Sequence, residues 1–261
     1  PIQVIGYHHQ VRDSIAGQPV MITYCTVCRT GRVFSPKVNG KLEDFRLVGM
    51  DHFNAMFEDA TTKTWWQQAT GEAIVGDLKG SRLDEIHAEQ SSLGMWVSKH
   101  PNTLILQPDT TFNKRYKSLD KFDDGTTPDD LEKRDSASWK DKSWVIGIDQ
   151  NNNSARAYDW NLLVEKRVIE DVVGELPIII ALENDTASFN VLSRKVRSEV
   201  LSFTPQPAFN NLMNDTNTNS TWTYSGLCID GVMKGSRLNK VRASQEFWHS
   251  WRTFHVGTTK F

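Results

Sequence analysis

The pentapeptide KGSRL occupies residues 79–83 and recurs unchanged at residues 234–238. Around it, FNAMFEDATTKTWW at 53–66 is answered by FNNLMNDTNTNSTW at 209–222, so two similar copies lie about 155–158 residues apart. Self-similarity at a fixed period indicates a repeated structural unit. The sequence therefore predicts two related units of about 100 residues each.

Short strands dominate the local patterns in both copies. VMITYCTV (20–27) and GRVFSPKV (31–38) carry β-branched and aromatic residues between Gly, Pro and Asn, and PIIIAL (177–182) does the same in the second copy. Apolar residues at helical spacing occur in fewer segments, such as SLGMWVSKH (92–100). We predict an α+β fold, predominantly antiparallel β, with two tandem pseudo-symmetric repeats and a few short helices.

A charged stretch separates the copies. Residues 107–142 are rich in charged and turn-forming residues without sustained periodicity, which is typical of a connecting segment. We therefore assign residues 1–106 to repeat one, which carries the Cys/His site, and residues 143–261 to a degenerate repeat two without the Cys pair. Because the chain starts at Pro1 without Met or a signal segment, we expect it to have been trimmed, with the first hairpin of repeat one missing.

The charge balance and the apolar runs exclude two classes of function. Lys+Arg 30 against Asp+Glu 32 gives a formal net charge of −2, so no global basic field is present to hold phosphate backbones. The longest apolar runs are far shorter than the roughly 20 residues that cross a bilayer. We expect a soluble protein with no nucleic-acid partner and no membrane insertion, acting on an unknown small-molecule substrate or electron partner.

The candidate site is YCTVCRTG at residues 24–31, which contains two of the three cysteines of the chain. Residues kept in both copies are best explained by folding, so residues present in one copy are the better functional candidates. Each candidate soft ligand of repeat one is replaced in repeat two: Cys25 by Glu183, Cys28 by Thr186, His8 by Lys166, His52 by Ala208 and Met56 by Leu212. The site is therefore predicted in repeat one, with Cys25 and Cys28 as its catalytic residues.

Spacing alone leaves several chemistries open for this pair. Two cysteines at i and i+3 can share a metal ion or form a disulfide. Soft thiolates with imidazole and a thioether suit copper, so we predict a metal site formed by Cys25, Cys28, His8, Met56 and His52, with copper favoured over zinc or iron. For Met56 core packing is favoured over ligation, and for His8 the two roles are equally favoured.

Two alternatives to metal binding stay open. The first is a metal-free thiol–disulfide oxidoreductase that uses the same cysteines. The second is a non-catalytic module that binds a ligand or partner and in which the CxxC is a structural clip. The first two hypotheses share a thiolate-centred redox function, and the third does not.

Several motifs in the same order resemble a known bacterial family. They are YHHQVRD (7–13), AGQPVMITYCTVCRT (16–30), MFED (56–59), GEAIVG (71–76) and HPNT (100–103). The arrangement resembles the family called domain of unknown function 3179, most closely in repeat one. Thr26 and Arg29 depart from the family pattern, which usually has Pro and Gly there.

The resemblance carries two implications. Some similar proteins are described as selenoproteins with selenocysteine in place of one cysteine of the pair, which implies reactive chalcogen chemistry at Cys25 or Cys28. Family members are often exported, which implies an extracytoplasmic or periplasmic setting. The family name itself states no reaction.

Overall fold

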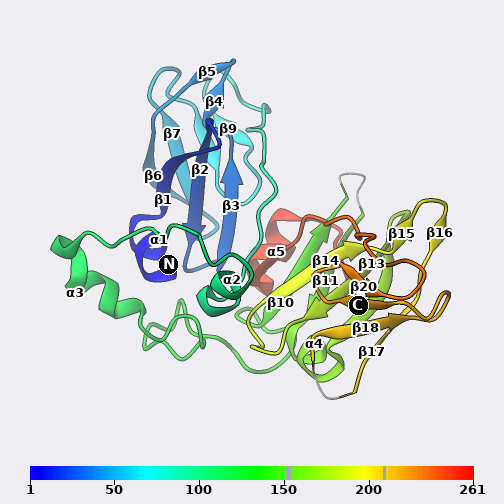
Figure 1. The fold of residues 1–261 in the computed structure, drawn as a ribbon. Coiled ribbons are helices and arrows are strands. Elements are labelled where there is room, and N and C mark those ends of the chain that lie inside the picture. Colours follow the sequence, from blue (N-terminus) through cyan, green and yellow to red (C-terminus); the bar gives the residue numbers. More distant parts are fainter. Residues whose placement is uncertain (151–153, 208–209) are drawn as a thin grey trace. The chain divides into compact units, whose positions relative to one another are not determined.

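The computed structural model describes residues 1–150, 154–207 and 210–261. Antiparallel β-sheets predominate and the helices are short, which confirms the predicted predominantly antiparallel β class with a few short helices. Two compact units make up the chain (Figure 1). Unit 1 comprises Pro1–Ala88, Leu104–Trp144 and Gln245–Val256, and unit 2 comprises Glu89–Thr103, Val145–Ser244 and Gly257–Phe261. Each unit is thus assembled from segments that are not contiguous in the sequence.

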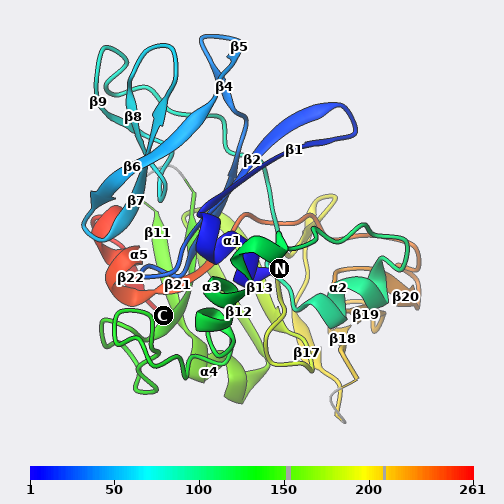
Figure 2. The same ribbon diagram turned by 90° about the vertical axis from the view of Figure 1, so that its left-hand side faces the viewer.

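Unit 1 begins with a short helix and a three-stranded antiparallel sheet. Helix α1 (Ile2–His8) is followed by β1 (Gln10–Ile15), β2 (Gln18–Cys25) and β3 (Thr30–Phe34), paired in the order β1-β2-β3. The β1–β2 hairpin, dark blue in Figure 2, turns at Ala16 and Gly17, both of which have positive φ. A two-residue turn of this kind matches the twist of the flanking strands and favours glycine. The next turn, between β2 and β3, contains the Cys pair.

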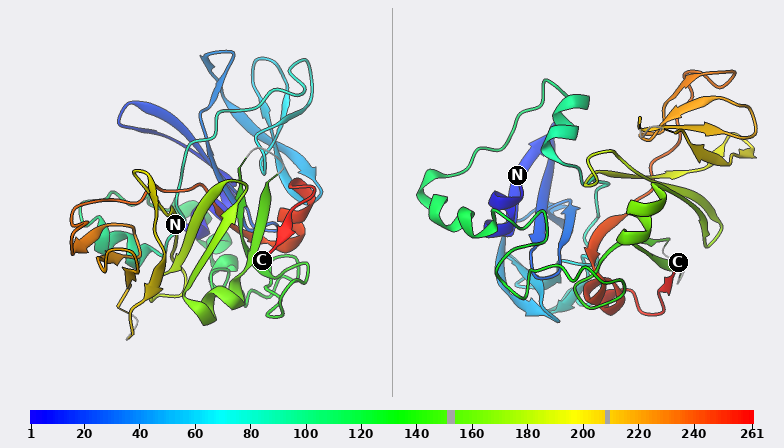
Figure 3. Two further views of the ribbon diagram at one scale, coloured as in Figure 1. Left: turned by 90° about the vertical axis from the view of Figure 1, so that its right-hand side faces the viewer. Right: turned by 90° about the horizontal axis from the view of Figure 1, so that it is seen from below.

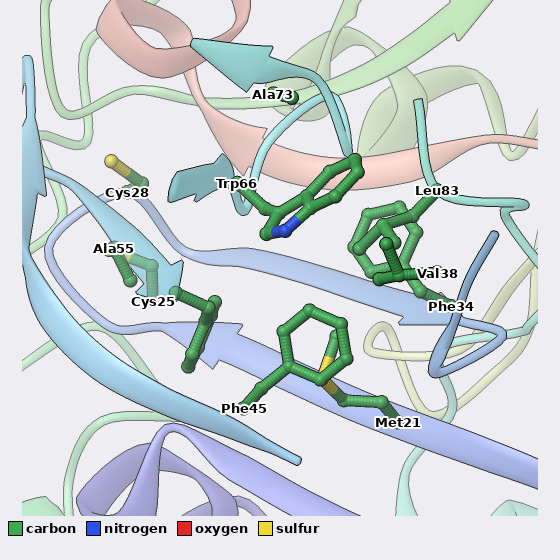
Figure 4. Close-up of a cluster of buried hydrophobic side chains, with 11 residues drawn as sticks. Met21, Cys25, Cys28, Phe34, Val38, Phe45, Ala55, Trp66, Ala73 and Leu83 are labelled. Atoms are coloured by element: carbon green, nitrogen blue, oxygen red, sulfur yellow. The ribbon is translucent and has the colours of Figure 1, made fainter. Parts of the chain in front are cut away.

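A second sheet of unit 1 covers this hairpin pair with apolar side chains. Its strands are β6 (Phe45–Asp51), β7 (Asn54–Asp59), β8 (Trp65–Gln67) and β9 (Ala73–Val75), all antiparallel, and β4 (Lys37–Val38) with β5 (Lys41–Leu42) forms a small hairpin before them. One buried cluster joins the two sheets (Figure 4): Met21, Cys25, Cys28, Phe34, Val38, Phe45, Ala55, Phe57, Trp66, Ala73 and Leu83. Both cysteines therefore belong to the core of unit 1.

Two further parts of the chain complete unit 1. The first contains η1 (Thr110–Phe112), α3 (Asn113–Tyr116) and η2 (Lys117–Leu119), where Leu119 and Phe122 pack against Tyr24. The second contains most of β21 (Ser244–Phe247) and all of α5 (Trp248–Phe254). The backbone N–H of Phe247 donates to the carbonyl of Cys28 over 3.0 Å, so this late segment lies directly against the Cys turn.

Unit 2 contains several small sheets, in which nearly all strand pairs are antiparallel (Figure 3). One of them is the three-stranded sheet of β12 (Val168–Val173), β13 (Leu176–Leu182) and β14 (Phe189–Ser193), paired in that order. Its other elements are α2 (Leu93–Lys99), β10 (Trp144–Asp149), β11 (Ala155–Asp159), α4 (Trp160–Lys166), β15 (Lys195–Val196), β16 (Glu199–Val200), β17 (Phe203–Pro205), β18 (Leu212–Asp215), β19 (Thr221–Thr223), β20 (Cys228–Asp230) and β22 (Thr259–Lys260). No helix in the described part of the chain is long and apolar enough to cross a membrane.

Corresponding positions of the two units make the same hydrogen bonds. The indole Nε1 of Trp66 donates to Asp59 over 3.0 Å, and that of Trp222 donates to Asp215 over 2.8 Å. Within the KGSRL segments, Gly80 N donates to Ala73 O and Gly235 N donates to Cys228 O, at 2.8 and 2.9 Å. The shared residues that make these contacts therefore have a structural role in both units. Ala208, the counterpart of His52, lies outside the described residues.

Candidate functional site

The Cys pair lies in the turn that connects β2 to β3. Cys25 is the last residue of β2 and pairs with Thr30, the first residue of β3. Arg29 has a φ of 54° and its N–H donates to Thr26 O over 3.1 Å, which closes the turn. Cys25 is 3% exposed and Cys28 is fully buried, and both are free thiols. The turn brings the two predicted catalytic residues together inside the core.

Hydrogen bonds shift the pKa values of the two thiols in opposite directions. The pKa of Cys25 is lowered, first by a hydrogen bond from the Cys28 thiol and then by backbone hydrogen bonds from Cys28, Ala55 and Val27, which outweigh burial. The pKa of Cys28 is raised by the same hydrogen bond to Cys25, by burial and by the charge of Cys25. Figure 4 shows Cys25 beside Ala55 of β7. Cys25 is thus the thiol that ionises first, and Cys28 keeps its proton.

A tight turn between β6 and β7 lies over Cys25. His52 and Phe53 form this turn with φ of 47° and 69°, a conformation that costs energy for residues other than glycine. The Sγ of Cys25 lies 3.3 Å from the carbonyl oxygen of Phe53, and the Phe53 side chain is 54% exposed. The Cys25 thiol therefore donates a hydrogen bond to the backbone of this turn.

Two basic side chains hold the middle of the Cys turn. Lys142 Nζ donates to the carbonyl of Val27 over 2.7 Å, and His249 Nε2 lies 3.1 Å from the same oxygen. Burial lowers the pKa of Lys142, while the charges of Cys28 and Cys25 act in the opposite direction. Burial and the neighbouring Lys142 lower the pKa of His249. A positive charge on Lys142 therefore lies within electrostatic range of both thiols.

A buried polar network lies behind Cys28. Glu246 is fully buried and its Oε1 accepts from Arg32 Nη2 over 2.6 Å. Its Oε2 accepts from Ser250 Oγ over 2.9 Å and from Thr30 Oγ1 over 3.3 Å. The Ser250 side chain acts to lower the pKa of the Cys28 thiol, against the larger effects of Cys25 and burial, which raise that pKa. The network reaches the Cys turn through Thr30, whose hydroxyl also donates to the carbonyl of Cys28 over 3.4 Å.

The three other predicted ligands make different contacts. His8 Nε2 lies 2.8 Å from Tyr116 Oη, and its ring packs against Phe112. The His52 side chain is 69% exposed and its Nδ1 lies 2.7 Å from Asp51 Oδ1. Met56 is buried on β7, where it alternates with Ala55 and Phe57 of the Cys cluster. Across the described residues, no group of three or more His, Cys, Asp or Glu side chains is placed to hold a metal ion.

Sequence reasoning did not identify Lys142, Glu246, Ser250 and His249 as site residues. They belong to the connecting segment and to the end of the predicted second repeat, although they lie in unit 1. A signal was available, since Glu246 aligns with Ser91 and Ser250 with Met95 in the other copy. A residue type found only in the second copy is therefore as informative as one found only in the first.

Comparison with known proteins assigns the chain to a family. No curated protein and no solved structure was found to match it. The model of the family described as "Protein of unknown function (DUF3179)" matches residues 1–258. Since this match spans nearly the whole chain, it confirms the resemblance seen in the motifs around the Cys pair. The chain belongs to the DUF3179 family.

Proposed function

We propose that this protein is a thiol–disulfide redox protein in which Cys25 is the attacking thiolate and Cys28 is the resolving thiol. The observation that carries the proposal is the hydrogen-bonded pair of free thiols in one turn, with the pKa of Cys25 lowered and that of Cys28 raised. Thiolate is the nucleophilic form in disulfide exchange, and the second thiol must stay available to release the substrate.

Access to Cys25 is part of the proposal. At 3% exposure the thiol needs an opening before it can meet a substrate sulfur. The turn of His52 and Phe53 is the segment in contact with Cys25 Sγ, and its strained backbone is typical of a functional site. The proposal includes the extracytoplasmic or periplasmic location that the family resemblance implies, because disulfides persist in oxidising compartments.

Copper binding by the same two sulfurs is the second candidate. The paired thiols favour it, because soft thiolates select copper(I), whereas structural zinc sites usually have four protein ligands. His8 and His52 make hydrogen bonds to other side chains, so we propose Cys25 and Cys28 alone as the copper ligands.

Redox titration of the intact chain tests the main proposal. In dithiothreitol buffers of graded potential, we expect a reversible two-electron couple and a Cys25–Cys28 disulfide, identified by mass spectrometry after digestion. In the reduced protein, iodoacetamide should modify Cys25 before Cys28, with half-maximal rate below the pH of about 8.5 that is usual for cysteine. Failure to form the disulfide would overturn the proposal.

Cys228 provides a matched control for these measurements. It is a free buried cysteine in unit 2 whose pKa is raised by burial. Cys228→Ser should leave the couple unchanged, whereas Cys25→Ser should abolish it. Titration with copper(I), repeated on Cys25→Ser, separates the second candidate: one equivalent bound by the wild type alone supports it, and equal binding by both refutes it.

A further inference from the structure

A second group of chemically reactive side chains belongs to unit 2 and takes no part in the proposed thiol chemistry. Glu183 is 2% exposed, and its Oε1 accepts from Lys99 Nζ over 2.5 Å and from Asn190 Nδ2 over 2.8 Å. Lys240 Nζ donates to the other end of the same carboxamide, Asn190 Oδ1, over 2.8 Å. An amine and a carboxamide therefore contact the same buried carboxylate oxygen, and a second amine contacts the carboxamide oxygen.

The amine and the carboxamide come from distant parts of the chain. Lys99 ends α2, in the segment Glu89–Thr103, which precedes the connecting segment and belongs to unit 2. Asn190 lies on β14 and is 6% exposed. Lys240 also forms an ion pair with Glu89 over 3.0 Å, so the two lysines hold both ends of this segment against the sheet. A covalent bond between Lys99 and Asn190 would fix α2 to β14.

The corresponding positions of unit 1 show that the shared framework does not need these four side chains. All four differ there: Cys25 stands for Glu183, Arg32 for Asn190, Glu85 for Lys240 and Phe254 for Lys99. In unit 1, Arg32 Nε and Glu85 Oε1 lie 3.7 Å apart in an ion pair. In unit 2 a carboxamide replaces the guanidinium of that pair. A carboxamide, unlike a guanidinium, can act as an acyl donor to an amine.

We propose that Lys99 and Asn190 form an intramolecular amide bond, with Glu183 as the general base and acid and Lys240 as the group that stabilises the carbonyl oxygen. The contacts supply what the reaction requires. A lysine amine is a competent nucleophile once it has lost a proton, and Glu183 is in direct contact to take that proton. The held geometry replaces a bimolecular encounter.

The reaction is balanced without an oxidant or a further reactant. The Lys99 ammonium gives one proton to Glu183, and the free amine attacks Cγ of Asn190, which forms the Nζ–Cγ bond. The negative charge that develops on Oδ1 is stabilised by the hydrogen bond from Lys240. The Cγ–Nδ2 bond then breaks. The leaving nitrogen takes one proton from the attacking nitrogen and one from Glu183, and departs as ammonium, so Glu183 is again a carboxylate.

Mass spectrometry of the full chain tests the bond. The protein is reduced with dithiothreitol first, so that a Cys25–Cys28 disulfide does not alter its mass. We expect the wild type to be lighter than its sequence mass by one ammonia, and a tryptic digest to contain one branched peptide that joins Lys99 to Asn190. A folded wild type with its full sequence mass would overturn the proposal, and so would a branched peptide that joins Asn190 to Lys240.

Four variants test the role of each side chain. Lys99→Arg keeps a positive charge beside Glu183 and should have its full sequence mass, as should Glu183→Gln, which cannot take the proton. Lys240→Met should slow bond formation by about a hundredfold, so that the linked fraction of fresh protein grows with time. Asn184→Ala, at a neighbouring exposed asparagine, is the control and should keep the bond. Circular dichroism checks that each variant is folded. A folded Glu183→Gln linked as fully as the wild type would overturn the role of Glu183.

Discussion

The turn from Cys25 to Thr30 in unit 1 and the turn from Glu183 to Ser188 in unit 2 are built alike and filled differently. Each follows the central strand of a three-stranded antiparallel sheet, and in unit 2 Glu183 N donates to Ser188 O over 2.8 Å. Unit 1 places a thiol where unit 2 places the carboxylate of Glu183. Both positions hold a buried acid, so the fold accepts either group there.

The difference lies in what stabilises the acid. Glu183 Oε1 accepts from Lys99 Nζ over 2.5 Å and from Asn190 Nδ2 over 2.8 Å, which fixes a buried carboxylate in an ion pair with a partly exposed lysine. Cys25 is stabilised by hydrogen bonds from the Cys28 thiol and backbone amides. An ion-paired carboxylate can exchange a proton but does not attack a sulfur, whereas a thiolate held by hydrogen bonds can still attack another sulfur. The two turns thus have the same backbone arrangement. Their chemistry differs because Cys25 and Glu183 have different hydrogen-bond partners.

The tryptophans that occupy the same position in the two units predict the largest effects, which are losses of folding stability. Trp66→Ala and Trp222→Ala should each lower the free energy of unfolding by about 3–5 kcal/mol, because each removes a buried indole and its bond to Asp59 or Asp215. Hydrogen exchange resolved by residue should place each loss in the unit that carries the change. Trp66→Phe keeps most of the ring volume and should cost less. A small loss in one unit alone would show that the framework is not equivalent.

Glu183, the buried acid of unit 2, predicts an intermediate loss of folding stability. In chains without the proposed amide bond, Glu183→Ala should cost about 1–3 kcal/mol of stability, because it leaves Asn190 Nδ2 unpaired while Lys99, at 36% exposure, can turn to water. Urea unfolding measures the loss, and Lys99→Met with the double variant completes a cycle that isolates the pair. The thiol chemistry of Cys25 should stay unchanged. Altered reactivity of Cys25 in Glu183→Ala would contradict the separation between framework and chemistry.

Strands and the Cys pair could be predicted from the sequence because both have local signals. Runs rich in β-branched residues predict β2 and β3, and the i, i+3 spacing of Cys25 and Cys28 predicts that the two sulfurs can share one site. The partners of that turn could not be predicted in the same way. Glu246 follows Cys28 by more than two hundred residues, and its role depends on a tertiary contact, the hydrogen bond from Phe247 N to Cys28 O.

The ligand candidates show the opposite limit of sequence reasoning. The side chains of His8 and Met56 suit copper, but residue type does not determine the direction in which a side chain points. Met56 alternates along β7 with the two residues that face the Cys cluster, and His8 ends a short helix whose last turn contacts Tyr116. Metal binding by these residues stays a prediction, and the structure gives each of them another contact.

Cys25, the buried acid of unit 1, predicts the smallest effect. This effect is a pH dependence of folding stability in the reduced protein. A thiol whose pKa is lowered in the folded state contributes stability that is fully present above its unfolded pKa of about 8.5, and that is lost as the pH falls through the folded pKa. The stability difference between wild type and Cys25→Ser should therefore grow as the pH rises toward about 8.5. Urea unfolding in dithiothreitol at several pH values measures it.

Cys228 supplies the opposite sign in the same experiment. Burial raises the pKa of Cys228, so its contribution is fully present below about 8.5 and is lost as the pH rises through the folded pKa. The difference between wild type and Cys228→Ser should stay level below about 8.5 and shrink above it. If Cys25 and Cys228 gave the same pH dependence, the Cys turn would be no more than another buried position of the framework, and the distinction between the two units would fail.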